Sequence, residues 1–490
     1  MAFTDRLHNR GSVSTGYDID QSATFDYTRN QWIERTIPYN SGRGNDSYRK
    51  ATFSLWLKRG NLATDRFFLG GSNSARYWAV KFNSSNKLEI YTHSGISGYN
   101  GTSPITTRQF LDASAWYHLV FRWDTTLSTA GDRFRLYVNG VEEDTWDTAP
   151  NIDQNAEGEF TTLSNVVHVF GGQNGYYNST GSNFDGQIAE INYLANTSAG
   201  PDEFGETNTD GQWVPIDTSS VSSQAAADSY RIDFGATDSS NPFNDTTSAN
   251  QDFSNASSSG APRIGTDTPT NNFMTWNPLT GHYNDTDLYL AGANHVLQGQ
   301  NGAYQLRMGT IGINPNYTSA KWYWELKNTS NINSSTGPEY SWGVATETRW
   351  MDIHNSGSDT DFRNGDGLAR YVSSYNTGGN GTGANTVWGV MVDCSGSNPV
   401  INLYRNGSSV YTYTYTAWSG RNFDEFLFPS GAAYGSGSEL VINSGGGYVQ
   451  EFTVDSSNTD ANGYGSFEYA PPSGALALCT KNLADDGGGY

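Results

Sequence analysis

The run Trp116-Tyr117-His118-Leu119-Val120-Phe121-Arg122-Trp123 is followed, after a polar loop, by Phe134-Arg135-Leu136-Tyr137-Val138-Asn139-Gly140. Aromatic and β-branched residues are frequent in both runs, and such residues fit the pleated surface of a strand. Asn-Gly after a strand-like run indicates a tight hairpin, because both central residues of that turn need a positive φ angle. The two runs therefore predict antiparallel β-structure.

Strand-like runs of this kind occur in both halves of the chain, separated by turn residues at a spacing typical of an antiparallel sandwich. In the first half they cover residues 52–59, 77–82, 87–92, 116–123, 134–138, 166–170 and 187–194. In the second half they cover residues 321–327, 341–345, 387–393, 400–405, 410–415, 426–428 and 439–443.

The chain has 490 residues, which is more than a domain with a single hydrophobic core usually contains. We predict an all-β protein with two tandem antiparallel β-sandwich domains joined by an irregular connector. The predicted parts are an N-terminal arm (1–16), a first sandwich (17–198), the connector (199–280), a second sandwich (281–482) and a flexible tail (483–490). The connector is rich in Ser, Thr, Asn and Gly. Its isolated apolar residues predict that it lies over a domain; they are Phe204, Trp213, Tyr230, Ile232, Phe234, Phe243 and Phe253.

Composition and charge exclude some classes of function. The formal net charge is −22, which argues against a phosphate-binding groove and so against nucleic acid as a partner. Aromatic residues make up 14% of the chain, enough to build packed cores and to argue against disorder. We expect no membrane insertion, because no apolar run approaches the ~20 residues of a span. The first residues lack the apolar core of a signal peptide, so we expect synthesis in a cytoplasm.

One short pattern occurs in both halves. Leu136-Tyr137-Val138-Asn139-Gly140 and Leu403-Tyr404-Arg405-Asn406-Gly407 share the form Leu-Tyr-x-Asn-Gly. Five residues are too few to establish a duplication, since two sandwiches with similar hairpins explain the match equally well.

The first half resembles the laminin-G-like branch of the concanavalin A-like lectin/glucanase superfamily, whose members are jelly-roll sandwiches. The matching pieces are residues 52–59, 112–121, 132–140 and 184–191. The second half resembles a SPRY domain through residues 321–327, 342–345, 387–393, 401–407 and 440–443. Asn443-Ser444-Gly445 departs from the Asn-Phe-Gly that many SPRY domains have at this point.

Both halves and the connector together resemble a family of structural proteins of tailed phages, over roughly residues 17–485. The connector carries much of this likeness, in residues 204–207, 211–215 and 267–273, together with residues 469–478. The resemblance implies a virion protein of the tail fibre or outer particle surface that recognises a host glycan or protein. It also implies other virion proteins and copies of itself as partners, in a trimer or ring. A purely architectural component and a polysaccharide depolymerase are the alternatives.

Hydrolysis is not expected. Retaining glycosidases need two carboxylates about 5–5.5 Å apart, and the glucanase branch places them at alternate positions of one strand. Here the comparable strand reads Glu190-Ile191-Asn192-Tyr193-Leu194, without the two downstream carboxylates. Glu142-Glu143-Asp144 is the nearest imitation of such a carboxylate pattern, but it follows a hairpin turn. We interpret it as a solvent-exposed arm of that hairpin.

Candidate binding residues lie on polar loops, where aromatic rings can stack on sugars. They are Trp350, Tyr371 and Tyr375 in the second half, and Tyr99, Tyr176 and Tyr177 in the first. Asp359, Asp361 and Asp366 form a candidate Ca²⁺ loop, although Arg363 stands where an oxygen ligand is needed. Asp185 and Asp124 are weaker candidates.

The remaining chemistry-bearing residues have structural interpretations. His118 and His168 lie within apolar strands and are predicted to be hydrogen-bonded structural histidines rather than zinc ligands. Cys394 and Cys479 are predicted to be buried thiols rather than a disulfide, because the chain is expected in a reducing compartment.

Overall fold

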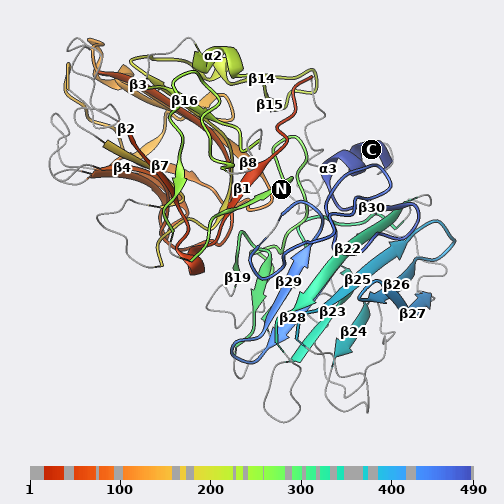
Figure 1. Cartoon of the computed structure of the whole chain (residues 1–490). Helices are drawn as coiled ribbons and strands as arrows, with labels where there is room; N and C mark the ends of the chain where they lie inside the picture. The colour runs from red at the N-terminus through yellow and green to blue at the C-terminus, as the bar shows by residue number, and fades with distance from the viewer. Residues whose placement is uncertain are drawn as a thin grey trace. The chain divides into compact units, whose positions relative to one another are not determined.

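The computed structural model shows a nearly all-β chain that divides into two compact units (Figure 1). The N-terminal unit spans Ser14–Thr270 and the C-terminal unit spans Asn271–Tyr490. The residues described are 16–37, 49–72, 77–92, 103–156, 166–172, 181–223, 228–235, 241–257, 259–281, 290–300, 305–315, 320–330, 339–346, 368–373, 384–414, 426–447 and 449–486.

Two antiparallel sheets form the N-terminal unit. The first has the order β10 (Val141–Glu142), β9 (Phe134–Val138), β8 (Trp116–Asp124), β3 (Lys50–Arg59), β13 (Gly186–Ala195), β1 (Ser22–Phe25), β18 (Arg263–Gly265), with β16 (Tyr230–Ile232) also paired to β13. The second has the order β11 (Trp146–Thr148), β7 (Ile105–Gln109), β6 (Lys87–Thr92), β5 (Tyr77–Phe82), β4 (Arg66–Ser72), β12 (Val166–Phe170), β2 (Ile33–Ile37), β17 (Ser254–Asn255).

The core of this unit lies between the two sheets. Alternate residues of a strand point to one face, so every second side chain can enter the core. Phe53, Leu55 and Leu57 of β3 do so from the first sheet, and Trp78 and Val80 of β5 do so from the second. All five are essentially inaccessible to solvent.

Residues after β13 complete the N-terminal unit. They contain a small hairpin of β14 (Gly205–Thr207) and β15 (Trp213–Pro215), the short helix α2 (Ser219–Ser223), and β16, β17 and β18. Of the seven apolar residues expected to hold the connector, six are buried and Trp213 is half-buried. The described part of residues 199–270 is therefore packed into the unit.

This segment covers the outer face of the central strands of the first sheet, so that face is buried there as well as the inner one. Nine of the ten residues of β3 and all ten of β13 are buried. Phe204 packs with Val120 and Leu194, while Trp213 packs beside Trp56.

A buried ion pair fixes the end of the covering segment to β3. Lys58 Nζ lies 2.8 Å from Asp267 Oδ2, and the two side chains are 2% and 0% exposed. The indole N–H of Trp116 donates to Asp267 Oδ1 at 3.2 Å, and Ser22 Oγ donates to the Asp267 carbonyl at 2.6 Å. Both charges of the pair are thus compensated by protein groups.

The C-terminal unit is a second pair of sheets. The larger has the order β19 (Leu290–Ala291), β20 (Val296–Gln298), β29 (Glu439–Asn443), β22 (Lys321–Asn328), β25 (Thr386–Asp393), β26 (Val400–Arg405), β27 (Ser408–Thr414), with β30 (Ala475–Ala477) parallel to β22. The smaller has the order β21 (Gln305–Met308), β28 (Leu427–Tyr434), β23 (Glu339–Thr346), β24 (Leu368–Ser373). Helix α3 (Thr480–Asp486) ends the described chain. No helix in the described parts is long and apolar enough to cross a bilayer.

The predicted all-β fold class is confirmed, and several strands have the predicted limits, among them β5, β9, β12, β26 and β29. Residues 483–486 of the predicted flexible tail belong to α3, while 487–490 lie outside the described residues. The predicted N-terminal arm lies outside them up to residue 15.

Asp267→Asn should destabilise the N-terminal unit strongly. The substitution leaves the buried Lys58 ammonium without its counter-charge, and such a loss costs about 3–5 kcal/mol. Urea unfolding followed by tryptophan fluorescence measures it. Glu142→Gln is the control, because it breaks the part-exposed pair with Arg135 and should change the free energy of unfolding by no more than about 1 kcal/mol. Equal effects of the two variants would contradict the role given to Asp267.

Candidate functional site

Most of the residues predicted to bind ligands lie outside the described residues. These are Trp350, Tyr375, Tyr99, Tyr176 and Tyr177, together with the candidate Ca²⁺ ligands Asp359, Asp361 and Asp366. The backbone of Tyr371 is described and lies in β24, opposite Trp342 of β23.

The two weaker Ca²⁺ candidates have protein partners. Asp185 Oδ2 accepts the Asn61 backbone N–H at 3.1 Å. Asp124 Oδ1 accepts the Thr126 backbone N–H at 3.1 Å, and its other oxygen lies 3.6 Å from Lys50 Nζ. Within the described parts of the chain, no group of three or more His, Cys, Asp or Glu side chains could hold a metal ion.

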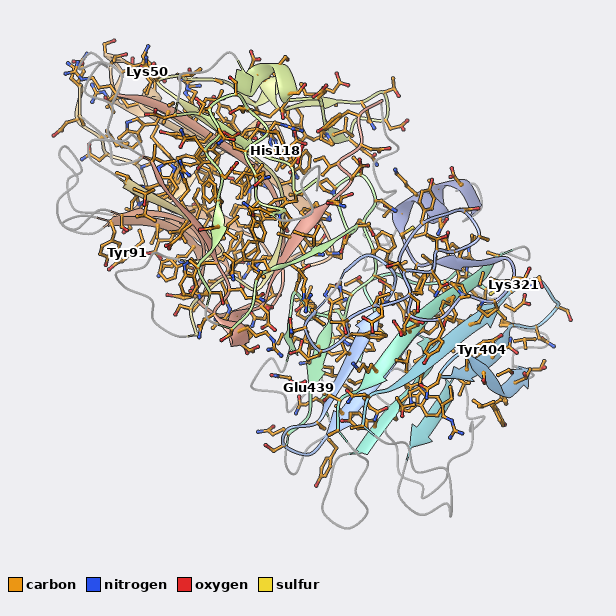
Figure 2. All side chains as sticks on the ribbon, in the orientation of Figure 1. Lys50, Tyr91, His118, Lys321, Tyr404 and Glu439 are labelled. Atoms are coloured by element: carbon orange, nitrogen blue, oxygen red, sulfur yellow. The ribbon has the colours of Figure 1, made fainter. Side chains whose placement is uncertain are left out.

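His118 lies deep among the side chains of the N-terminal unit (Figure 2). Its ring stacks on Trp56, with centroids 4.6 Å apart. The Trp213 indole donates to His118 Nδ1 at 2.9 Å, which leaves the ring proton on Nε2, 2.8 Å from Ser54 Oγ. Burial lowers the pKa of His118 to about 3, so the ring is neutral. The residue is a hydrogen-bonded structural histidine, as predicted.

His168 and the two cysteines are also interior groups. His168 Nδ1 lies 3.0 Å from the hydroxyl of Tyr230, and burial lowers its pKa to about 3. Cys394 and Cys479 are buried free thiols, and burial raises the pKa of each to about 12. Such thiols are not nucleophiles at neutral pH.

Glu190 is the carboxylate at the position where the glucanase resemblance would place catalysis. It lies in β13 at a register shift, with a φ of 39°, and is 2% exposed. The Tyr17 hydroxyl donates to its Oε2 at 3.0 Å, and Thr218 Oγ1 donates to Oε1. Arg231 Nη2 lies 3.3 Å from Oε1 and also holds the chain through Nη1, 2.9 Å from Asp233. Glu190 therefore ties the segment before β1 and the segment around β16 to the first sheet.

Glu325 is a second buried carboxylate, in the C-terminal unit. It accepts the backbone N–H groups of Glu468 and Tyr469, both at 2.9 Å, and the Asn443 amide at 3.1 Å. The Tyr323 hydroxyl lies 3.3 Å away. Burial raises the pKa of Glu325 to about 7, against the opposing effect of these donors. Its position fixes residues 468–469 over the outer face of β22.

Each of these carboxylates is surrounded by donors that belong to the fold. Hydrolysis of a glycosidic bond by a retaining mechanism needs two carboxyl groups flanking the substrate. The partners found around Glu190 and Glu325 are hydroxyl, amide and guanidinium groups instead. Both sites are arranged to join segments of chain.

A different arrangement occurs on the outer face of the second sheet. We call it the Tyr91 face; it consists of Phe67, Tyr77, Lys81, Glu89 and Tyr91. The Tyr77 and Tyr91 rings stack with centroids 5.8 Å apart, and Phe67 meets Tyr91 edge-on at 6.4 Å. Tyr91, labelled in Figure 2, is half-buried. It lies in β6, Tyr77 lies in β5 and Phe67 lies in β4.

Charged groups lie beside these rings. Lys81 Nζ is 5.4 Å from the Phe67 ring centroid and 5.6 Å from that of Tyr91. The same ammonium group pairs with Asp65 at 2.7 Å and with Glu89 at 3.6 Å. The rings are thus bordered by one ammonium group and two carboxylates. Phe67, Tyr77 and Lys81 are themselves buried, while Glu89 and Tyr91 are partly exposed.

The sequence contained the signal for this face, but only as two separate patterns. Trp78, Val80 and Phe82 point into the core, so Tyr77 and Lys81 must share the opposite side of β5. Glu89 and Tyr91 alternate with Leu88 and Ile90 in the same way. The pairing of Lys81 with Glu89 needed the register of β5 and β6.

Residues 20–197 match the family described as the concanavalin A-like lectin/glucanases superfamily, a laminin G family. The match gives the N-terminal unit a lectin-type fold, and such a fold supports a binding role. No curated protein matches the chain.

Three solved structures illustrate the structural similarity. A native heptameric SAP-like pentraxin from Limulus polyphemus is 14% identical, with a TM-score of 0.29, covering 51% of this chain and 95% of that one. Domains LG4-5 of the mouse laminin alpha1 chain are 10% identical, with a TM-score of 0.27, covering 93% and 88%. The SPRY domain of human HERC1 is 14% identical, with a TM-score of 0.21, covering 34% and 96%.

The pKa of Glu325 predicts that the C-terminal unit loses stability as pH rises. Between its ordinary value of 4.5 and about 7, the unfolded chain ionises this carboxyl while the folded chain keeps the proton. The unfolded state then binds fewer protons, so the free energy of unfolding falls with rising pH, by on the order of 2–3 kcal/mol. Urea unfolding at pH 4.5 and pH 7.5 should show this slope in the wild type and in Glu468→Gln, and a weaker slope in Glu325→Gln. An unchanged slope in Glu325→Gln would show that another group titrates.

Proposed function

We propose that this chain is a structural protein of a tailed-phage virion, on the tail fibre or the outer particle surface. Its lectin-like N-terminal unit binds an uncharged glycan on the host surface through the Tyr91 face. The virion assignment rests on the sequence resemblance over residues 17–485, and the glycan assignment rests on the side chains of the Tyr91 face.

The half-buried ring of Tyr91 is the observation that carries the glycan assignment. Its stacking on Tyr77 and its edge contact with Phe67 hold the ring in one orientation. A fixed ring loses little conformational entropy when a sugar packs on it, so the contact favours binding. The apolar C–H face of a pyranose is the chemical complement of such a ring.

The charges around the ring favour an uncharged sugar over an acidic one. Lys81 is already paired with Asp65 and Glu89, so these three groups carry a net charge of −1. Carboxylates accept hydrogen bonds from sugar hydroxyls but repel the carboxylates of acidic sugars. The formal charge of −22 on the whole chain adds to that repulsion.

Binding without turnover agrees with the buried carboxylates. Glu190 is held by Tyr17, Thr218 and Arg231 under the segment that covers the first sheet. Substrate would have to displace that segment to reach it. The Tyr91 face lies on the other sheet, so it supports recognition independently of Glu190.

Tyr91→Ala should abolish or weaken glycan binding. Wild-type protein screened on an array of uncharged and acidic glycans should bind uncharged ones. Calorimetry with the best of these glycans should give a Kd at least about tenfold higher for Tyr91→Ala than for the wild type. A tenfold change corresponds to about 1.4 kcal/mol of binding free energy. Tyr404→Ala is the matched control, since Tyr404 is also a half-exposed tyrosine on a sheet but belongs to the C-terminal unit.

Three outcomes would count against the proposal. If Tyr91→Ala binds the glycan as tightly as the wild type, the Tyr91 face is not the recognition surface. An array without any signal would favour the architectural alternative. Release of reducing sugar from host polysaccharide, lost in Glu190→Gln, would favour the depolymerase.

The virion assignment predicts that the chain is part of the mature particle. Particles of the phage that encodes it, purified on a density gradient, should contain its peptides at a constant ratio to the capsid protein. Antibody against the N-terminal unit should label intact particles at the tail or surface and block adsorption to the host. A chain found only in the lysate of infected cells would refute this.

A further inference from the structure

The hairpin of β14 and β15 lies over the outer face of the first sheet without joining that sheet. Among the described strands, β14 and β15 pair only with each other. Phe204, which precedes β14, and Val214 of β15 are each 1% exposed, whereas residues 206, 207 and 209–211 are exposed. The hairpin is thus held by the side chains beneath it.

Trp213 of β15 joins the hairpin to the buried ring of His118. The indole N–H donates to His118 Nδ1 at 2.9 Å, and the two rings are stacked with centroids 6.0 Å apart. The Trp213 ring also covers Gly140 and Gly205, where an added Cβ would lie 2.4 Å and 2.7 Å from ring atoms. His118 is stacked in turn on Trp56. Of these three rings, only that of Trp213 is part-exposed.

The bond between Trp213 and His118 requires a neutral imidazole. An indole nitrogen can donate a hydrogen bond but cannot accept one. His118 Nδ1 must therefore carry a lone pair, and the ring proton lies on Nε2, 2.8 Å from Ser54 Oγ. A protonated imidazole has an N–H group at both nitrogens. Protonation of His118 would bring two N–H groups face to face and make this contact repulsive.

The charged groups around His118 do not favour the proton. Flanking the ring on the outer face are Lys58, Glu190 and Tyr137, whose respective partners are Asp267, Arg231 and Arg122. The acids of the hairpin itself, Glu206 and Asp210, are exposed. Burial alone lowers the pKa of His118 to about 3. The ring therefore resists protonation while Trp213 covers it, and takes up a proton more readily once it is uncovered.

We infer that the hairpin of β14 and β15 is a cover that acid opens: a proton on His118 expels the indole of Trp213, and the hairpin leaves the outer face of the first sheet. Opening exposes the stacked rings of Trp56 and His118, which form a second aromatic surface on the N-terminal unit. The Tyr91 face lies on the other sheet, so this device is independent of the glycan assignment. In an acidic medium the unit presents this additional surface.

The difference in proton affinity between the closed and open forms sets the size of the effect. The pKa of His118 is about 3 with the cover closed, whereas an imidazole in water has a pKa of about 6.5. Between these values the open form binds a proton that the closed form does not, so opening is favoured as pH falls. From pH 7.5 to pH 4.5 the equilibrium constant for opening should rise by up to about a hundredfold.

Amide hydrogen exchange of the full chain, corrected for intrinsic exchange rates, tests the inference. Protection of the amides of residues 205–207, 213 and 214 should fall at least about tenfold between pH 7.5 and pH 4.5, because an isolated two-stranded hairpin is barely stable in water. The amides of β12 in the second sheet are the internal reference and should keep their protection. Equal protection of the hairpin at both pH values would overturn the inference.

Variants identify the group that titrates. His118→Gln keeps an acceptor for Trp213 and a donor for Ser54 but cannot take up a proton, so the hairpin should lose its dependence on pH. Trp213→Phe keeps a ring but removes the opposing N–H group, and it should weaken the acid response as well.

His168→Gln is the matched control, because it replaces the other buried histidine whose pKa is about 3, and it should leave the acid response intact. Circular dichroism at pH 4.5 should show that each variant is folded. An acid response that persists in both His118→Gln and Trp213→Phe, or one that folded His168→Gln lacks, would contradict the role given to His118.

Discussion

The central strands β3 and β13 of the first sheet are buried on both faces, and every charged group that enters them must therefore be compensated inside the protein. Lys58 is paired with Asp267, and Glu190 with Arg231, in each case with a residue from beyond β13. Buried charges left alone cost several kcal/mol, whereas apolar contacts tolerate small shifts. These pairs thus determine where the covering segment lies, and Phe204 and Trp213 fill the space between them.

This covering decides which surfaces are left for recognition. Trp56, His118 and Glu190 have the polar and aromatic character of a binding cleft, but Trp213 and the residues around Thr218 lie against them. The outer face of the second sheet carries the half-buried Tyr91 beside Lys81, and it is there that we propose recognition. The same chemistry of rings beside carboxylates therefore has a structural role on one sheet and a proposed binding role on the other.

The sequence predicted the regular strands well because their signal is local. β5 is a run of aromatic and aliphatic residues with a single lysine, and β26 ends at Asn-Gly; their limits were predicted from these patterns. The sequence could not predict that β16 pairs with β13. Tyr230-Arg231-Ile232 is a strand of three residues, too short to show a repeating pattern of hydrophobic residues. The Tyr91 face was missed for a related reason: its members come from three strands, and only the registers of those strands bring them together. The loop residues chosen instead lie mostly outside the described chain, with Tyr371 on β24.

The two Asn-Gly hairpins show that the turn sequence determines the geometry of the turn but not the strand that follows it. In both units the asparagine closes the turn with the same two bonds to the neighbouring strand, so the five-residue pattern accounts for the local geometry. It does not determine the character of the strand that follows. After Gly140 come Val141, Glu142 and Glu143, and the pairing stops after two residues; after Gly407 the uncharged run continues and the strand extends to Thr414. The residues after the glycine thus decide how far the strand continues, for two residues in β10 and for seven in β27.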